Sequence, residues 1–479
     1  MKYEAVIGLE VHVHLKTKTK AFCACPNEFG KEANTQVCPV CLGLPGSLPV
    51  LNQVAFDFAI KTGIALNCSI QKFTKFDRKN YFYPDLPKNY QISQYDMPLS
   101  SKGYLDINIE GRTKRIRITR VHLEEDAGKL IHRENESLVD FNRAGIPLLE
   151  IVSEPDINSP QEAYEYLTRL KSILQYLEVS DCDMEKGSLR CDANVSIRKP
   201  GTKELGTKTE LKNMNSFKGV KEALEYEIIR QEEALNEGKT ITQETRLWDA
   251  KTSVSVPMRT KEGAKDYRYF PDPDLPMFII NEEKIEEIRN SIPELPEKKI
   301  SRFIKEYGLS EYDAKIIVSE KRFADLTESR FKAYQNENKK AVANWSIGPI
   351  LEAAGSLNCL PHELEIPGGE EELLNLIRLV EESKISNLAA KSVFTESLSS
   401  KKTASLIIKE KDLFQISDSG SLEKFADEVI SENIKSVQDF KAGKDNAIMF
   451  LVGQMMKKSK GKANPKTVQD ILRRRLENV

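Results

Sequence analysis

Three short segments alternate between apolar and polar residues, and a period of two is typical of β-strands with one buried face. The segments run from Ile7 to Leu15, from Leu189 to Arg198 and from Thr207 to Lys212. A solvated sheet face produces this pattern in any single strand. Each of the three polar faces mixes acidic residues with basic or imidazole groups, which favours a shared site. These polar residues are Glu10, His12, His14, Arg190, Asp192, Lys208, Glu210 and Lys212.

Two segments in the strand-rich N-terminal part have helical spacing instead. Ser159-Pro160-Gln161-Glu162 is a capping-box sequence with Pro at the first helical position, and leucines follow at helical intervals. A second helix is expected to begin at Asn215 or Ser216 and to end at Gly238.

Prolines from Pro271 to Pro296 mark a change from strand-like to helical composition, and a further break lies near Ser399–Lys402. We therefore expect an α+β domain over residues 1–292, an all-α domain over 293–405 and a small α-helical tail domain over 406–479. The length of 479 residues agrees with about three domains.

Composition narrows the class of protein. Basic and acidic residues number 71 and 73, so the net charge is −2, and any nucleic acid must bind a local basic surface. No signal peptide is recognised, and the apolar run from Ile448 to Met456 is too short to span a bilayer. Half of the eight cysteines are scattered, unlike a secreted disulfide framework. We expect a cytoplasmic protein with reduced thiols and no membrane partner.

The other four cysteines form the pairs Cys23-x-Cys25 and Cys38-x-x-Cys41. Two chelating pairs joined by a short loop are typical of a four-thiolate zinc site, and the alternative is four unrelated buried cysteines. Because thiolates fill all four ligand positions, we expect a structural Zn²⁺ in an insertion over residues 23–41.

Further carboxylates lie in two other segments. Glu124, Glu125 and Asp126 end a basic strand-like run, where a solvated turn is the alternative. Glu150 lies within the apolar run from Pro147 to Val152, where a carboxylate needs a metal or cation partner. Carboxylates with a histidine suit a hard divalent cation, and neighbouring Lys and Arg suit phosphate oxygens.

Residues 75–96 interleave aromatic residues with Arg78, Lys79 and Lys88. This segment could border a nucleotide or an acceptor end, or be a loop packed by tyrosines, and the sequence does not separate the two. Gly201 to Lys208 resembles a P-loop but lacks its Lys-Ser/Thr order, so any ATP is bound by a different architecture.

The C-terminal segment from Met455 carries eight Lys and Arg against Asp470 and Glu477, a net charge of +6. A phosphate-backbone contact surface and a solvated basic helix end both fit this composition. The candidate nucleic-acid contacts are Lys457, Lys458, Lys460 and Lys462.

Several longer motifs resemble one known family from end to end. They are Val6-Ile-Gly-Leu-Glu10-Val-His12, Asp77-Arg-Lys-Asn-Tyr-Phe-Tyr-Pro-Asp85, Leu123-Glu-Glu-Asp-Ala-Gly-Lys129, Glu154-Pro-Asp156, Gly187-Ser-Leu-Arg-Cys-Asp192, Glu210-Leu-Lys-Asn-Met-Asn-Ser216, Asp266-Tyr-Arg-Tyr-Phe-Pro271 and Gly461-Lys-Ala-Asn-Pro465. The family that the chain resembles is the B subunit of aspartyl/glutamyl-tRNA(Asn/Gln) amidotransferase. Its members do not all keep the four cysteines, so zinc is an expectation for this branch.

The resemblance implies a cradle domain similar to glutamine synthetase with a mixed or antiparallel sheet, then a helical domain and a tRNA-binding tail. It implies a heterotrimer, in which an amidase-type glutaminase partner releases ammonia and a small third partner wraps the other two. The activity implied is ATP-dependent phosphorylation of the side-chain carboxylate of misacylated tRNA, Glu-tRNA(Gln) or Asp-tRNA(Asn), followed by amidation with ammonia.

The site residues follow from the matched motifs together with the polar faces. Mg²⁺ is assigned to Glu10, His12, Glu125 and Glu150, with Glu124, Asp192 and Glu210 completing the metal or nucleotide site. Phosphate contact or lining of an ammonia route is assigned to Lys79, Lys88, Arg190 and Lys208. A non-catalytic zinc-bearing RNA-binding protein and a stand-alone ligase that uses free ammonia are the alternative functions.

Overall fold

A computed structural model of the chain describes residues 3–260, 267–415, 419–441, 444, 446–459 and 463–477. The chain folds as two compact units, Met1–Pro296 and Glu297–Val479. The first unit is built on β-sheets and the second on helices, which confirms the α+β class. None of the helices described is long and apolar enough to cross a membrane.

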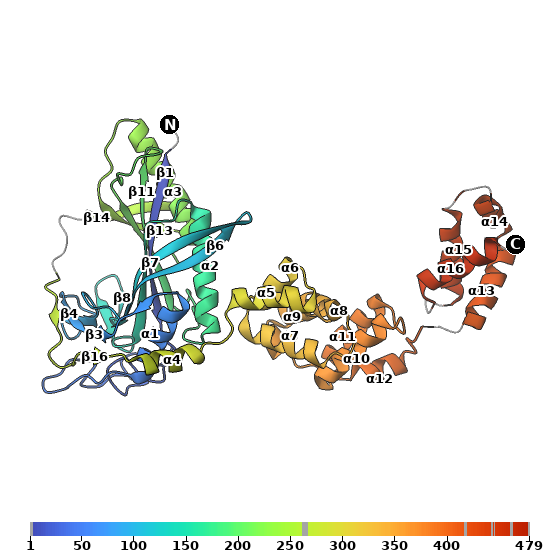
Figure 1. Cartoon of the computed structure of the whole chain (residues 1–479), viewed down its shortest axis with the longest axis horizontal. Coiled ribbons are helices and arrows are strands. Elements are labelled where there is room, and N and C mark those ends of the chain that lie inside the picture. Colours follow the sequence, from blue (N-terminus) through green and yellow to red (C-terminus); the bar gives the residue numbers. More distant parts are fainter. Residues whose placement is uncertain are drawn as a thin grey trace. The chain divides into compact units, whose positions relative to one another are not determined.

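One mixed sheet dominates the first unit (Figure 1). All its neighbouring strands are antiparallel except β12 and β13, which are parallel. In spatial order the strands are β14 (Val254–Thr260), β13 (Glu244–Asp249), β12 (Thr209–Lys212), β11 (Leu189–Arg198), β1 (Glu4–His14), β10 (Pro147–Ser153), β7 (Arg112–Glu125), β6 (Ser100–Ile109) and β2 (Ser69–Ile70).

Two of the three predicted strands are confirmed as β1 and β11. The third, β12, begins at Thr209, so Lys208 lies outside it. The smaller sheets pair β15 (Phe270–Pro271), β4 (Asp77–Asn80) and β5 (Tyr90–Ser93); β16 (Phe278–Ile279) and β3 (Phe73–Thr74); and β8 (Lys129–His132) and β9 (Ser137–Asp140).

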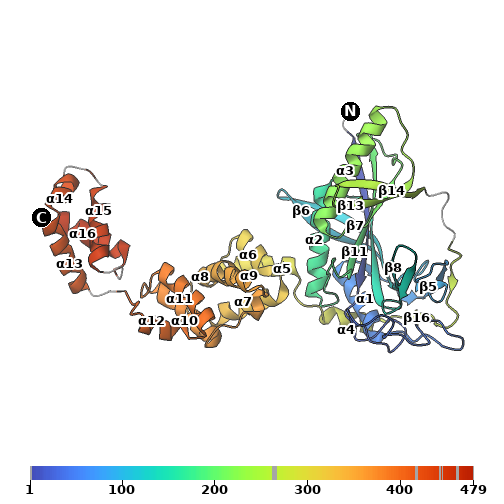
Figure 2. The same ribbon diagram turned by 180° about the vertical axis from the view of Figure 1, so that it is seen from behind.

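Helices α2 and α3 lie along the large sheet in both views (Figures 1 and 2). Ser159 accepts a hydrogen bond from the Glu162 backbone N–H at 3.1 Å, as predicted, but the Glu162 carboxylate accepts from Asn158 N–H at 2.7 Å, so the capping box is not reciprocal. Ser216 caps the second predicted helix. The helices of this unit are α1 (Gln53–Ala65), α2 (Pro160–Tyr176), α3 (Phe217–Asn236) and α4 (Glu282–Asn290).

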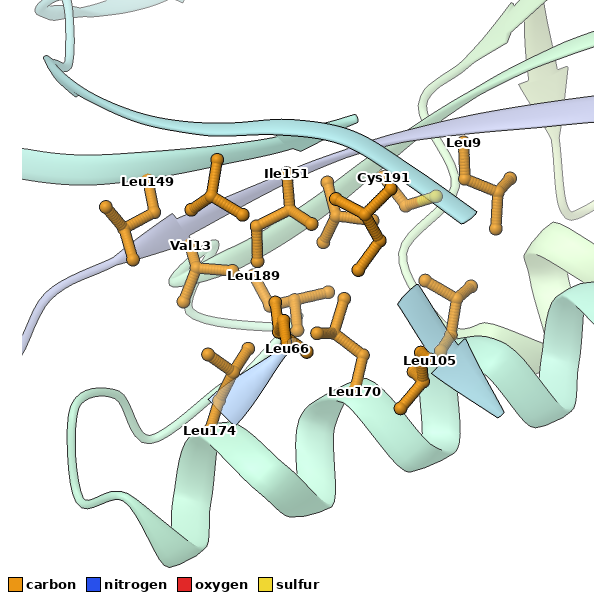
Figure 3. Close-up of a cluster of buried hydrophobic side chains, with 14 of the residues drawn as sticks. Leu9, Val13, Leu66, Leu105, Leu149, Ile151, Leu170, Leu174, Leu189 and Cys191 are labelled. Atoms are coloured by element: carbon orange, nitrogen blue, oxygen red, sulfur yellow. The ribbon is translucent and has the colours of Figure 1, made fainter. Parts of the chain in front are cut away.

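The core of the first unit lies between the sheet and these helices. Leu170 and Leu174 of α2 face Val13, Ile151 and Leu189 of the sheet (Figure 3). Burial of these apolar side chains fixes which face of each strand points inward, because neighbouring residues of a strand point to opposite faces. The polar residues of β1, β10 and β11 therefore gather on the other face.

The second unit is helical throughout the part described. Its first helices are α5 (Pro296–Tyr307), α6 (Glu311–Val318), α7 (Lys321–Ala333), α8 (Lys339–Trp345), the π-helical turn η1 (Ser346–Ile350), α9 (Leu351–Leu357), the 3₁₀ turn η2 (Pro361–Glu363), α10 (Gly369–Glu381), α11 (Asn387–Ser400) and α12 (Ala404–Glu410). The expected boundary at 405/406 falls inside α12. The last four helices share one apolar core and are α13 (Ser419–Glu432), α14 (Ile434–Lys441), α15 (Ala447–Lys458) and α16 (Pro465–Glu477).

Candidate active site and metal centre

Strand register aligns four polar side chains side by side on the face of the large sheet opposite the core. His12 of β1 pairs with Arg190 of β11 on one side and with Glu150 of β10 on the other. Glu150 in turn pairs with His122 of β7. Glu10, two residues before His12, pairs with Asp192 in the neighbouring row. Segments distant in sequence thus meet through strand pairing alone.

Glu150 lies at the centre of this cluster. Its Oε2 is 3.5 Å from His12 Nε2 and 3.6 Å from His122 Nε2. His12 Nε2 is also 3.6 Å from Glu10 and 3.8 Å from Glu124, and His122 Nε2 is 3.7 Å from Glu124. Glu150 therefore belongs to two groups of possible metal ligands, each with its ligand atoms within 4.8 Å of one another. The groups are Glu10, His12 and Glu150, and His122, Glu124 and Glu150.

The charges of this cluster act strongly on one another. Burial lowers the pKa of His12, but the hydrogen bond to Glu150 and the charges of Glu150, Glu124 and Glu10 outweigh burial and raise it to about 9. Burial and the Glu150 charge raise the pKa of Glu10. The carboxylates thus create a local negative potential that favours a cation. Carboxylate oxygens with imidazole nitrogens suit Mg²⁺ or a similar divalent ion.

Lys79 of β4 supplies a positive charge at the edge of the cluster. Burial disfavours its charged form, but Glu124 and neighbouring groups raise its pKa above the usual range. Its Nζ lies 4.9 Å from the centre of the Tyr267 ring, and Tyr95 stacks on Tyr269 at 4.2 Å between ring centres. Two aromatic residues of segment 75–96, Tyr81 and Tyr95, therefore pack with Tyr267 and Tyr269 near Lys79.

The remaining predicted residues of the polar face hold one another by ion pairs. Lys212 contacts Asp192 and lies 3.4 Å from Glu210. Glu210 also accepts a hydrogen bond from the Thr245 hydroxyl at 2.7 Å. Asp192 and Glu210 therefore share Lys212 next to Glu10, whose pKa Asp192 helps to raise.

Glu125 is placed differently from the expected Mg²⁺ set, because it is in neither ligand group. Its carboxylate lies 2.6 Å from Lys88 Nζ and accepts from the Ile92 N–H at 2.9 Å. Neighbouring residues of a strand point to opposite faces, so Glu124 can face the histidines and Glu125 cannot. Lys88, expected at phosphate, is bound to Glu125, and Lys208 is exposed outside β12.

Replacing Glu125 with Ala should destabilise the first unit by about 3–5 kcal/mol, because Lys88 would keep a buried charge without its partner. Urea unfolding measures this loss. The double variant Lys88→Met, Glu125→Leu should recover most of the stability, since both charges are removed. Equal losses in the single and double variants would contradict a role of Glu125 as the partner of Lys88.

The site residues assigned from the sequence do not include two histidines and a buried aspartate. His122 precedes Glu124 by two residues on β7 and completes the second ligand group. His14 Nε2 lies 2.7 Å from Asp126 Oδ2, and Arg190 lies 3.0 Å from the same oxygen. The sequence does contain a signal for both histidines. His14 follows His12 by two residues and His122 precedes Glu124 by two, and residues two apart in a strand point to the same face.

The four clustered cysteines converge as predicted, with all four sulfurs within 4.8 Å of one another and none in a disulfide. Four sulfurs around one zinc lie about 3.8 Å apart, so the set fits tetrahedral Zn²⁺. A hydrogen bond from Cys23 lowers the pKa of Cys41 to about 4, and the Cys38 N–H donates to Cys41 Sγ at 3.1 Å. The lowered pKa favours the thiolate form of Cys41.

One cavity is lined by residues of this cysteine loop and by Lys88 and Glu125. Gly43 contacts Lys88 so closely that a Cβ added to it would lie 2.5 Å from Lys88 Cγ. Gly43 also has a φ of +69°, which favours glycine. The cysteine loop therefore packs directly on Lys88.

The basic tail is only partly free to bind an anion. Lys457 is exposed, whereas Lys458 lies 2.7 Å from Glu428 and 2.8 Å from Glu432. Lys460 and Lys462 lie outside the described residues. Of the four candidates, Lys457 is the described lysine with an exposed side chain.

Comparisons with known proteins identify the family of the chain. Residues 5–286 match the GatB/GatE catalytic domain, and residues 325–476 match the GatB domain. A protein of Caldanaerobacter subterraneus, named as the B subunit of aspartyl/glutamyl-tRNA(Asn/Gln) amidotransferase, is 58% identical over 99% of this chain and all of its own length. One of the same name from Carboxydothermus hydrogenoformans is 56% identical over the full length of both. The chain therefore belongs to the B-subunit family of aspartyl/glutamyl-tRNA(Asn/Gln) amidotransferases.

Proposed function

We propose that this chain phosphorylates the side-chain carboxylate of misacylated Glu-tRNA(Gln), Asp-tRNA(Asn) or both with ATP, and then amidates it with ammonia. The observation that carries the proposal is the carboxylate–histidine cluster around Glu150, bordered by Lys79 and Arg190. Family membership supports the same activity, since the relatives are named as B subunits of aspartyl/glutamyl-tRNA(Asn/Gln) amidotransferase.

The reaction needs ATP because a carboxylate is a poor electrophile. Its negative charge repels a nucleophile, and oxide is not a usable leaving group. Transfer of the γ-phosphoryl group to the carboxylate oxygen creates an acyl phosphate and releases ADP. Ammonia then attacks the acyl carbon, the C–O bond to phosphate breaks, and the amide and inorganic phosphate are released. Catalysis of phosphoryl transfer rests on positioning and on neutralising developing charge.

Each residue of the cluster is assigned by its position. Glu10, His12, Glu124 and Glu150, together with His122, would hold Mg²⁺, with Asp192 and Glu210 bordering them. The bound ion would neutralise charge on the transferred phosphoryl group. Lys79 and Arg190 would contact phosphate oxygens. Lys88 and Glu125 would line the path of ammonia or position the acceptor, and Lys208 keeps no role in this assignment.

The proposal includes two partners and a structural metal. An amidase-type glutaminase would supply ammonia, and a small third protein would complete a heterotrimer in the cytoplasm. Cys23, Cys25, Cys38 and Cys41 would hold Zn²⁺. The domain containing the sheet would carry the chemistry, the helical domain would follow it, and the tail would bind tRNA.

The test combines the assembled complex with ATP, Mg²⁺ and Glu-tRNA(Gln) or Asp-tRNA(Asn), and measures ADP and amidated tRNA. The proposal expects both products with glutamine as the nitrogen source. Binding of tRNA without ADP formation would support the non-catalytic RNA-binding protein instead. Equally fast amidation by the isolated chain with free ammonium would support a stand-alone ligase.

Replacing Lys457 with Ala should weaken tRNA binding. It should also reduce the slope of log K for tRNA binding against log salt concentration by about one unit, because an exposed lysine releases about one counterion on binding phosphate. Lys458→Ala should have a smaller effect, since Glu428 and Glu432 already hold that ammonium. Filter binding over a range of salt concentrations measures both. A larger effect from Lys458 would contradict the proposed contact surface.

A further inference from the structure

Lys20 has a fully buried side chain, with an exposed fraction of 0%. Its Nζ lies 3.7 Å from Cys41 Sγ and donates to the Phe141 carbonyl oxygen at 3.3 Å. Among the residues described, no carboxylate lies within ion-pair distance of this ammonium. A buried lysine normally has an anionic partner, because an uncompensated charge is costly to bury. The partner available here is the Cys41 sulfur.

We propose that Lys20 is a constituent of the four-cysteine metal site, a positioning residue whose ammonium donates to the Cys41 thiolate. This inference rests on the structural zinc proposed above. Four thiolates around Zn²⁺ carry a net charge of −2, and the buried Lys20 ammonium reduces it to −1.

Local structure holds Lys20 in this position from both sides of the loop. Its backbone N–H donates to the carbonyl oxygen of Cys25 at 3.0 Å, and its own carbonyl accepts from Asn52 Nδ2 at 3.2 Å. Gly145 packs beside its aliphatic stem, since a Cβ there would make an ordinary contact with Lys20 Cδ at 3.4 Å. The residue is therefore tied to the ligand Cys25 by its backbone and to the ligand Cys41 by its side chain.

A hydrogen bond to a ligand sulfur withdraws electron density from it and fixes its orientation. Partners of this kind commonly change metal affinity by about 10- to 100-fold. Lys20 would act in the same way on Cys41. Its second hydrogen bond, to Phe141, links the metal loop to the segment that leads into β10.

The experiment uses the full-length chain with Lys20→Met, which removes the ammonium and keeps the stem. Lys18→Met is the matched control, because Lys18 is exposed two residues earlier. Zinc retention against a chromophoric chelator should weaken by about 10- to 100-fold in Lys20→Met and stay unchanged in Lys18→Met. Unchanged zinc affinity in both variants would overturn the inference.

Cobalt substitution adds a readout that a purely structural role would not move. The thiolate-to-cobalt charge-transfer band should shift to longer wavelength in Lys20→Met, because a sulfur without its hydrogen bond gives up an electron more easily. An unshifted band in a folded variant would overturn the proposal. Wild-type protein without zinc by elemental analysis would instead refute the metal site itself, and the inference with it.

Amine labelling of the wild-type chain keeps the test decisive if Lys20→Met does not fold. Lys20 should resist acetylation while zinc is bound and become labelled after chelation, whereas Lys18 should be labelled in both states. Mass spectrometry of the labelled peptides measures both lysines together. Equal labelling of Lys20 in the two states would contradict its place in the metal site.

Discussion

Replacing Glu150 with Gln should reduce tRNA-dependent ADP formation by about 1000-fold while leaving tRNA affinity nearly intact. Glu150 is shared by both groups of possible ligands, so one substitution weakens both. It also removes the carboxylate that lies against His12 and His122. His12→Ala should act in the same direction. Single-turnover assays of the assembled complex with Glu-tRNA(Gln) measure the rate.

Glu136→Gln is the matched control, because Glu136 is an exposed glutamate outside both ligand groups. It should retain the wild-type rate. Circular dichroism melting must show that Glu150→Gln is folded. A folded Glu150→Gln protein with a near-wild-type rate would place the chemistry elsewhere, and an equal loss of tRNA binding would point to a structural role.

Replacing Cys38 with Ser should reduce bound zinc from about one ion per chain to nearly none. The melting temperature of the first unit should fall by roughly 10 °C, because metal binding contributes directly to folding of the loop. Amidation should fall as well, since the loop packs on Lys88 through Gly43. Elemental analysis, melting curves and limited proteolysis of the loop test these results, together with the amidation assay.

Cys359→Ser is the control for this experiment, because Cys359 lies outside the cluster and is also a free thiol. Its zinc content and melting temperature should match the wild type. A stable Cys38→Ser protein that keeps its zinc would remove the metal site from the proposal.

The strands that carry most of the site are predictable because each has one buried and one polar face. In β1 and β11 the alternation identifies Glu10, His12, Arg190 and Asp192, and strand pairing brings them together. The polar cluster can be predicted because burial of the apolar residues in the core places the alternating polar residues together on the opposite face. Glu150 is recognisable as well, since it interrupts an apolar run.

The end of β7 cannot be interpreted in the same way. Its last five residues, Val121–Glu125, are all buried, and the sequence does not show which of the adjacent carboxylates Glu124 and Glu125 faces the site. The sequence therefore groups Glu125 with the metal ligands, whereas Glu124 and His122 occupy that position. The pairing of Lys88 with Glu125 joins segments more than thirty residues apart, and no local sequence pattern predicts such a contact.

The cysteine spacing predicts the four-thiolate cluster, because ligands at short spacing can close on one ion without knowledge of the rest of the fold. Nothing in the sequence singles out Lys20. Its sequence neighbours Lys16 and Lys18 are exposed, and only the tertiary packing distinguishes it from them.

The contact between Gly43 and Lys88 has a consequence for how such proteins can diverge. The main chain at Gly43 is itself the surface against which Lys88 rests, so natural selection acts on the shape of the loop as well as on its thiols. A lineage that discards the four cysteines must rebuild that surface by other packing before it can tolerate their loss. The glycine should therefore outlast the cysteines in such lineages, because the aliphatic stem of Lys88 still needs the same backbone beside it.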